Sequence, residues 1–296
     1  MKQIFLTTVM LVAAFCLQAA EPFKVKLYPN GPKESTYVTE PETNVNNRLR
    51  NVTEPRMEVF LPEGESTGRF VVICPGGGYV HITIESEGYE VARWLNKRGI
   101  AAGVLTYRTP NTHGDATIND VLRAVELTRE NAAEWKVDPA KVGVMGFSAG
   151  GHLASMAVTK YNSEKNRPDF GILIYPVITL NMGKTHAGSR LNLLGEVSDE
   201  VADKYSAEKL VNSNTPTCFL AHCDDDRAVP PYNSISFYAA MKEHGVKGEL
   251  HVYPRGGHGW GFLNPFPMRA EFDASLERWL KGLDEPEPQF PRGPRR

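Results

Sequence analysis

The segment GFSAG at residues 146–150 carries the clearest chemical signal in the chain. A strand-like apolar run, 142–145, precedes Ser148, and a helical pattern of apolar residues, 151–160, follows it. A serine on a sharp turn between strand and helix projects its hydroxyl above the sheet, and small neighbours allow the backbone to turn that tightly. The alternative is a glycine-lined turn whose serine caps a helix. The strand before and the helix after favour a nucleophile at Ser148.

A serine hydroxyl needs a base to accept its proton and a carboxylate to orient that base. His258 lies in the loop GGHGWG after a predicted strand, and its flanking glycines give the loop the freedom to reach the serine. Three consecutive aspartates, 224–226, follow another predicted strand. Asp226 is preferred as the acid, then Asp225 and Asp224, and the alternative for all three is a solvated acidic turn. The histidines at 152, 222, 244 and 251 are expected to pack or to lie at the surface.

The glycines after the predicted strand 70–74 are suited to stabilise an oxyanion. Residues 76–78 are all glycine, so backbone N–H groups there can approach a substrate closely. We expect the N–H groups of Gly77, Gly78 and Ala149 to bind the oxyanion of a tetrahedral intermediate. Neither GxGxxG nor a following Lys-Ser/Thr is present, which argues against a nucleotide loop. The sequence predicts no cofactor and no metal, since HExxH is absent and the run HCD at 222–224 lacks ligand spacing.

Three further side chains beside these motifs are candidates for substrate binding. Tyr79 follows the glycine loop and Trp260 follows the predicted base, so either ring could stack on a sugar or an aryl ring; filling the pocket wall is an equal alternative. Arg108 could bind a sugar hydroxyl or a carboxylate, although a structural ion pair is favoured. Glu85 and Glu87 open a predicted helix, where acids stabilise the helix dipole, which argues against a glycosidase pair.

Alternating strand and helix patterns from about residue 56 indicate an α/β fold that would position these residues. Continuous apolar runs, typical of a buried and mostly parallel sheet, predict strands at 57–61, 70–74, 101–107, 142–147, 170–175, 217–223 and 249–253. Apolar residues at three- and four-residue spacing predict helices at 89–97, 116–135, 151–161, 232–243 and 268–281. The nucleophile, acid and base each follow a strand's carboxyl end, where such sheets bind ligands.

The remaining segments have their own signatures. Residues 1–20 combine a positive start, an apolar stretch and small residues at 19 and 20, as in a cleaved secretory signal; lipidation at Cys16 is disfavoured by the bulky residue before it. Residues 21–55 are predicted to form a surface arm and 177–215 a cap-like insertion within a catalytic domain spanning 56–283. The proline-rich residues 284–296 are predicted to form a flexible tail. We expect a secreted or periplasmic protein without a membrane span.

Composition excludes several other classes of protein. Of the 296 residues, 41% are hydrophobic and 23% charged, which is ordinary for a globular chain. The 33 Lys and Arg residues balance 35 Asp and Glu residues without a long basic run, so nucleic acid is not an expected partner. Cleavage of the signal would leave Cys74, Cys218 and Cys223. This odd number does not imply a disulfide framework, and we expect small buried hydrophobic residues.

Taken together, the motifs resemble the secreted α/β-hydrolase esterases that include acetyl xylan esterases and feruloyl-esterase-like proteins. The resemblance covers residues 56–283 and rests on CPGGGY at 74–79, EG at 87–88, YR at 107–108, GFSAGGH at 146–152, VP at 229–230, NS at 233–234 and GGHGWG at 256–261. It implies the α/β-hydrolase fold, with Ser148, Asp226 and His258 as the triad and 76–78 as the oxyanion loop. Many lipases begin that loop with His-Gly; the Cys-Pro found here matches the acetyl xylan esterase-like group.

The resemblance also implies a function. The expected activity is that of a serine carboxylesterase removing short acyl groups, acetyl first and feruloyl second, from an acylated polysaccharide or oligosaccharide such as xylan. A serine peptidase of the prolyl-oligopeptidase type shares the triad order, but such peptidases usually carry a large extra domain, and the arm 21–55 is too short to be one. A non-catalytic carbohydrate-binding relative is disfavoured because all three triad residues are present.

Overall fold

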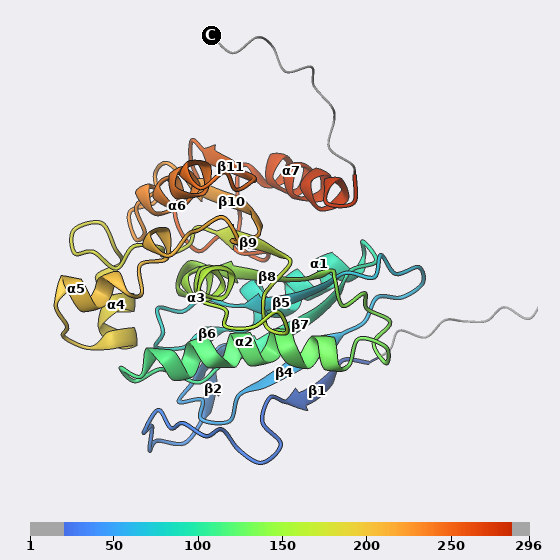
Figure 1. Cartoon of the computed structure of the whole chain (residues 1–296), viewed down its shortest axis with the longest axis horizontal. Coiled ribbons are helices and arrows are strands. Elements are labelled where there is room, and N and C mark those ends of the chain that lie inside the picture. The colour runs from blue at the N-terminus through green and yellow to red at the C-terminus, as the bar shows by residue number, and fades with distance from the viewer. Residues whose placement is uncertain (1–20, 286–296) are drawn as a thin grey trace, which may run out of the picture.

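An eight-stranded sheet runs through the protein, whose computed structural model describes residues 21–285 (Figure 1). In spatial order its strands are β1 (Phe23–Lys26), β4 (Arg56–Phe60), β7 (Ala101–Thr106), β5 (Phe70–Cys74), β8 (Val142–Phe147), β9 (Phe170–Ile174), β10 (Thr217–Cys223) and β11 (Gly248–Tyr253). The pairs β1–β4 and β4–β7 are antiparallel and the other pairs are parallel. Every residue of β5, β7, β8 and β9 is buried, as in a parallel sheet covered on both faces.

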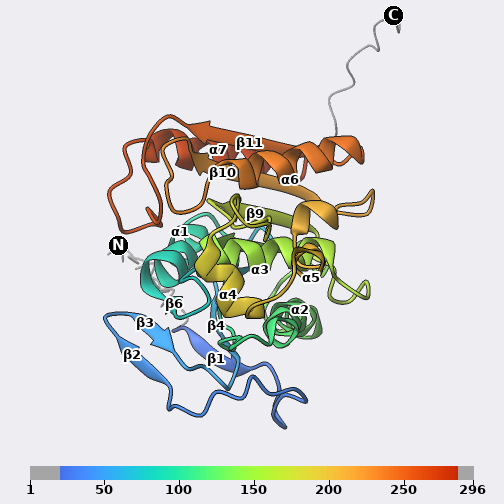
Figure 2. The ribbon, with the colours of Figure 1, turned by 90° about the vertical axis from the view of Figure 1, so that its left-hand side faces the viewer.

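Helices cover both faces of this sheet. On one face lie α2 (Gly114–Glu130), α3 (Ser148–Thr159) and α6 (Tyr232–Glu243), and on the other α1 (Glu90–Asn96) and α7 (Arg269–Gly282) (Figures 1 and 2). A π-helical turn, η1 (Glu85–Tyr89), leads into α1. Successive residues of β10 point to opposite faces. Cys218 lies on the face of α3, where a Cβ on Gly171 would contact both Cys218 and Val158 of α3. Phe219 packs on Trp279 of α7 with ring centroids 5.7 Å apart.

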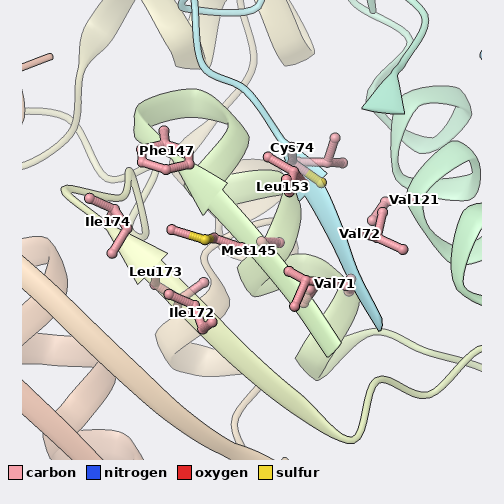
Figure 3. Packing of buried hydrophobic residues seen from close by; sticks show 14 of the residues in the cluster. Val71, Val72, Cys74, Val121, Met145, Phe147, Leu153, Ile172, Leu173 and Ile174 are labelled. Carbon is pink, nitrogen blue, oxygen red and sulfur yellow. The ribbon is translucent and has the colours of Figure 1, made fainter. Parts of the chain in front are cut away.

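The core is continuous around β8, the strand that leads to Ser148. Because β8 and β9 are parallel and in register, Met145 lies beside Ile172 and Phe147 beside Ile174, as Figure 3 shows. All four side chains are fully buried. Burial of one such side chain stabilises the fold by about 1.5–3 kcal/mol. This packing gives the turn after β8 a rigid base.

The predicted fold, a mostly parallel sheet with helices on both faces, is confirmed. Each of the seven predicted strands is present, with ends that agree to within one residue. The helix predicted at 116–135 instead spans Gly114–Glu130, and at its end the side-chain amide of Asn131 donates to the Leu127 carbonyl at 2.7 Å. The helix predicted to begin at residue 151 begins at Ser148, since the turn before it is tighter than the pattern indicates.

The two segments outside the predicted alternation also contain regular structure. In 21–55, where no strand is predicted, β1 joins the main sheet, while β2 (Thr43–Val45) and β3 (Arg48–Arg50) form a small antiparallel sheet with β6 (Ile82–Thr83). The predicted insertion contains α4 (Ala187–Leu194), α5 (Asp199–Asp203) and a 3₁₀ turn, η2 (Ala207–Lys209). Figure 2 shows α4 and the small sheet on the same side of the molecule.

Other sequence predictions concern the chain ends and the cysteines. The predicted signal, 1–20, and all but the first two residues of the predicted tail lie outside the described residues. Asp284 forms ion pairs with Arg69 at 2.7 Å and Lys141 at 3.0 Å, so the first tail residue is anchored. Within residues 21–285, no helix has the length and apolar character needed to cross a membrane. As predicted, the described cysteines are free and buried: Cys74, Cys218 and Cys223.

Candidate active site

Ser148 occupies a strained turn between β8 and α3. Its φ of 53° lies in the left-handed region, which glycine adopts far more readily than serine. The turn is crowded: a Cβ at position 146 would lie 2.1 Å from the carbonyl oxygen of Gly150, and a Cβ at position 150 would lie 2.1 Å from that of Cys74. Glycine is therefore required at both ends of the GFSAG motif. Close packing at these two glycines holds the strained serine in place.

Ser148, His258 and Asp226 form one hydrogen-bonded chain. The Ser148 hydroxyl donates to Nε2 of His258 at 2.8 Å, and Nδ1 of His258 donates to Oδ2 of Asp226 at 2.6 Å. The other oxygen of Asp226 accepts the backbone N–H groups of Ala228 and Val229, each at 2.9 Å. With its proton on Nδ1, the imidazole presents a lone pair on Nε2 to the serine. The arrangement can generate a serine nucleophile.

A second buried histidine, His222, supports the charge on Asp226. Its Nε2 lies 3.3 Å from Oδ2 of Asp226 and 2.9 Å from the carbonyl oxygen of Val229, while its Nδ1 accepts from the Ser234 hydroxyl. Burial raises the pKa of Asp226, but hydrogen bonds with His222 and His258 outweigh burial and hold this pKa well below its ordinary value. The carboxylate is therefore ionised and can stabilise an imidazolium. The sequence pattern indicated only a packing or surface role for His222.

The neighbouring aspartates occupy different positions. Oδ1 of Asp225 accepts the N–H of Gly257 at 2.8 Å, so this exposed carboxylate anchors the histidine loop from outside. Asp224 is exposed as well. Of the three acids that the sequence offered, only Asp226 is buried against the base. Within residues 21–285, no three His, Cys, Asp or Glu side chains are grouped in a way that could hold a metal ion.

A buried carboxylate, Glu87, joins the glycine loop to the histidine loop. Its Oε2 accepts the N–H of Gly76 at 2.7 Å and its Oε1 accepts the hydroxyl of Tyr175 at 2.8 Å. The same hydroxyl oxygen accepts the N–H of Gly261 at 2.9 Å. The Tyr175 and His258 rings pack in a T-shaped arrangement, with ring centroids 4.9 Å apart. The sequence predicted only a helix-dipole role for Glu87, because nothing in its local pattern indicates burial.

The glycine loop that carries two of the amides assigned to the oxyanion begins beside the nucleophile. Gly76 packs so closely on Ser148 that a Cβ on this glycine would lie 3.0 Å from the serine Cβ. Among the described residues, the N–H groups of Gly77 and Gly78 have no protein acceptor. Ala149 lies in the first turn of α3, where an N–H group has no intrahelical acceptor. These three amides are open to bind a developing negative charge.

The three side chains predicted to bind substrate are instead part of the interior. Each is at most 2% exposed and has a buried partner: Tyr79 donates to Nδ1 of His152 at 2.7 Å, Arg108 pairs with Asp120 at 2.7 Å, and Trp260 stacks on Phe266 with centroids 4.1 Å apart. With so little exposed surface, these side chains have their main contacts inside the protein, and the structure favours a packing role over direct substrate binding. The alternatives considered for them, a pocket wall and a structural ion pair, fit the structure.

His186, on the predicted insertion, faces the site although the sequence did not single it out. It caps α4, with Nδ1 accepting the N–H of Ser189 at 3.1 Å, so the neutral ring carries its proton on Nε2. Among the described residues no protein group accepts from this Nε2. The ring lies beside Gly78, and burial and the charge of His258 lower the pKa of His186. The sequence signal that could have identified His186 is its position in 177–215, the segment predicted to form a cap.

Comparison with known proteins identifies the family. The family model BD-FAE matches residues 57–241. The chain belongs to the BD-FAE family. This BD-FAE chain is 41% identical over 238 residues to the acetylxylan esterase of Xylanibacter ruminicola, a match covering 78% of the chain and 49% of that protein. It is 35% identical over 225 residues to endo-1,4-beta-xylanase B of Butyrivibrio fibrisolvens, covering 71% and 35% respectively. The chain thus spans half or less of the length of these curated relatives.

Solved structures agree with the fold of this BD-FAE chain. The acetyl ester-xyloside bifunctional hydrolase from Caldicellulosiruptor lactoaceticus is 35% identical, with a TM-score of 0.76 over 88% of this chain and 96% of that one. The carboxylesterase Cest-2923 from Lactobacillus plantarum, 21% identical with a TM-score of 0.66, covers 82% and 97% and shows the fold alone. The predicted α/β-hydrolase fold and the resemblance to acetyl xylan esterases are confirmed.

Proposed function

We propose that this protein is a serine carboxylic ester hydrolase that removes short acyl groups, acetyl above all, from a plant polysaccharide such as xylan. The observation that carries the proposal is the hydrogen-bonded chain Ser148–His258–Asp226 beside three open backbone amides. Similarity to an acetylxylan esterase and to an acetyl ester-xyloside hydrolase supports acetyl esters of xylan as the substrate class. Similarity to part of an endo-1,4-beta-xylanase also supports xylan as the polymer.

The first half of the reaction acylates the serine. Oγ of Ser148 attacks the ester carbonyl carbon while Nε2 of His258 accepts the hydroxyl proton, and Asp226 stabilises the imidazolium that forms. The N–H groups of Gly77, Gly78 and Ala149 bind the oxyanion of the tetrahedral intermediate. His258 then gives its proton to the departing sugar oxygen, and the bond between that oxygen and the carbonyl carbon breaks. An acetyl-serine remains.

The second half releases the acid. A water molecule takes the place of the sugar, His258 accepts one of its protons, and the hydroxide attacks the acetyl carbonyl through the same oxyanion site. Collapse of this intermediate expels Oγ of Ser148, which recovers its proton from His258. The products are acetate and the free serine, so the cycle needs no cofactor.

The test is acetate release from acetylated xylan, run beside ferulate release from a feruloylated arabinose oligomer, with the wild type and Ser148→Ala. We expect acetate from the wild type and none from the variant. Ferulate alone would transfer the assignment to a feruloyl esterase. Neither product, in a protein that still hydrolyses an aryl acetate, would overturn the xylan substrate and leave the triad. Cleavage of an aminoacyl-proline amide would instead indicate a peptidase.

The proposal includes export of the protein from the cytoplasm. It is supported by the sequence of residues 1–20, with Lys2 at the start, an apolar stretch, and Ala19 and Ala20 at the end. A secreted or periplasmic location would bring the enzyme to a polymeric substrate that cannot enter the cell. The N-terminal residue of the protein recovered from the periplasm or medium tests this: cleavage after Ala20 leaves Glu21 first, whereas an intact N-terminus in the cytoplasm would contradict it.

A further inference from the structure

A polar groove adjoins the oxyanion loop. It is lined by β3, by the loop after β7 and by α4, and has a volume of about 380 Å³. Tyr79, which follows Gly78 directly, forms part of its wall. The amide of Asn192, another wall residue, donates to the Gly78 carbonyl oxygen at 2.8 Å. The groove therefore begins one residue from Gly78, whose amide is assigned to the oxyanion, on the side of the molecule that carries α4 and the small sheet (Figure 2).

The chemistry of the lining points to a neutral polyhydroxylated ligand. Arg50 and Glu40 bring opposite charges, and among the described residues neither side chain has an ion-pair or hydrogen-bond partner. Amide and hydroxyl groups add further polar atoms: Asn51, Asn111, Asn192, Thr109 and Thr112. Each of the three amides donates one hydrogen to a backbone carbonyl, which leaves its second hydrogen and its oxygen for a ligand. A site for an anion or a cation would carry one sign of charge, whereas balanced charges with many amides suit sugar hydroxyl groups.

Two exposed apolar side chains complete the surface that a sugar ring needs. Val80 is 40% exposed and Leu191 is 52% exposed, and both line the groove. The C–H face of a pyranose ring is apolar and gains free energy by covering such side chains, while its hydroxyl groups bond at the rim. Apolar side chains, amides and a guanidinium that has no ion-pair partner within residues 21–285 together match a carbohydrate better than a lipid or a peptide.

The backbone of the groove walls is held in an unusual conformation by hydrogen bonds. Four of its non-glycine residues have backbone φ in the left-handed region: Asn51 at 56°, Tyr79 at 62°, Asn111 at 43° and Thr112 at 70°. For a β-branched residue such as Thr112 this conformation is costly and needs support. Support comes from hydrogen bonds across the walls, since the N–H of Thr112 donates to the Asn192 carbonyl at 3.0 Å and the Asn111 amide donates to the Thr36 carbonyl at 3.0 Å.

We propose that this groove is a carbohydrate subsite that holds unacylated sugar units of the substrate chain while the acylated unit meets Ser148. The proposal rests on the proposed function for its choice of sugar, an oligosaccharide of the xylan main chain. Its central polar contact is Arg50, which is half-buried at the groove. A bound chain would place its neighbouring sugars along α4 and β3 and leave the ester at the serine.

The test measures binding without catalysis. Unsubstituted xylohexaose is titrated calorimetrically into the full-length protein as wild type, Arg50→Ala and Arg48→Ala. Arg48 is the matched control, because it lies on the same strand, also lacks an ion pair among the described residues, and is not part of the groove lining. We expect binding by the wild type, a loss of affinity of about tenfold in Arg50→Ala, and little change in Arg48→Ala.

A second variant tests the apolar wall. Leu191→Ala should also weaken binding of xylohexaose. The control is Val201→Ala, which should not weaken binding, because Val201 is an exposed apolar residue of α5 outside the groove lining. Absence of binding to the wild type, or equal affinities in Arg50→Ala and Arg48→Ala, would overturn the subsite. Acetate release from acetylated xylan is measured separately. Release of acetate without binding that depends on the groove would contradict only the subsite. Binding without release of acetate would contradict only the proposed function.

Discussion

Glu87 and Gly76 are 11 positions apart in the chain, yet the carboxylate of Glu87 accepts the N–H of Gly76 at 2.7 Å. The other carboxylate oxygen accepts from Tyr175, whose hydroxyl oxygen accepts from Gly261 in the histidine loop. Burial raises the pKa of Glu87, while the bonds from Tyr175 and Gly76 oppose that shift. One buried group thereby holds the oxyanion loop and the loop of the base in a fixed relation.

Replacing Glu87 with alanine should lower kcat more than it raises KM. The Gly76 amide would lose its acceptor and the glycine loop would shift, and a displacement of about 1 Å can cost about 100-fold in rate. Oxyanion contacts strengthen in the transition state, so ground-state binding should change little. Steady-state hydrolysis of 4-nitrophenyl acetate measures both constants.

The matched control for this variant is Glu85→Ala. Glu85 lies in the same π-helical turn, but its carboxylate pairs at the surface with Arg93 at 2.9 Å. The kcat of Glu85→Ala should remain close to that of the wild type. Equal losses in the two variants, or a raised KM with kcat preserved, would contradict a positioning role for Glu87.

Asp226→Asn should reduce kcat by about 10⁴-fold, because the amide can favour the wrong tautomer of His258. Asp225→Asn should cost far less, since Asp225 acts only through the N–H of Gly257. Ester hydrolysis by the two purified variants decides between these acids. The reverse order of losses would return the triad assignment to Asp225.

The same substitution should change how stability depends on pH. The pKa of Asp226 is depressed in the folded protein, so its ionised form stabilises the fold above the ordinary aspartate pKa of about 4. This contribution is lost as the pH falls below that value. In urea unfolding, the free-energy difference between the wild type and Asp226→Asn should therefore shrink as the pH is lowered from about 7 to about 3. A difference that stays constant would contradict the depressed pKa.

His186→Asn should lower kcat/KM for an acetylated xylo-oligosaccharide by about tenfold, as expected for one lost hydrogen-bond donor. Asparagine is a good N-cap residue, so α4 should keep its start while the Nε2 donor is removed. Ser198→Asn, which changes the N-cap of α5, serves as the control. If both variants behave like the wild type, His186 only caps its helix.

Arg108→Ala should lower the free energy of unfolding and leave the KM for substrate unchanged. Arg108 is 2% exposed and pairs with the fully buried Asp120 at 2.7 Å, and breaking such a pair costs about 3–5 kcal/mol. Arg123→Ala removes surface pairs with Glu126 and Glu130 and a hydrogen bond to the Leu27 carbonyl, and should cost less than Arg108→Ala. Urea unfolding compares them. A higher KM without loss of stability would restore the substrate-binding role that the sequence predicted.

Local patterns predicted the sheet and the positions of Ser148 and His258, because continuous apolar strands and glycine-flanked loops are encoded within a few residues. Local patterns could not decide among the three aspartates, because the burial of Asp226 against His222 and His258 depends on how two loops meet in the folded protein. Side-chain direction was beyond the sequence: Tyr79 and Trp260 adjoin the site along the chain but point into the interior.

Two strands of 21–55, β2 and β3, escaped prediction for a different reason. β2 and β3 have three residues each and are largely polar, so neither shows a hydrophobic period. Glu87 was missed because its partners, Gly76 and Tyr175, come from separate strand ends. Contacts between loops that follow different strands are set by the assembled sheet, and single-segment patterns do not contain them.

The nucleophile itself is tested most directly by a fluorophosphonate, with intact-protein mass spectrometry and esterase activity followed on the same samples. The wild type should gain the mass of one phosphonyl group as activity is lost, the modified peptide should contain Ser148, and Ser148→Ala should gain none. Labelling of Ser148→Ala at the wild-type rate, or an active wild type that resists labelling, would contradict a Ser148 nucleophile activated by His258 and Asp226.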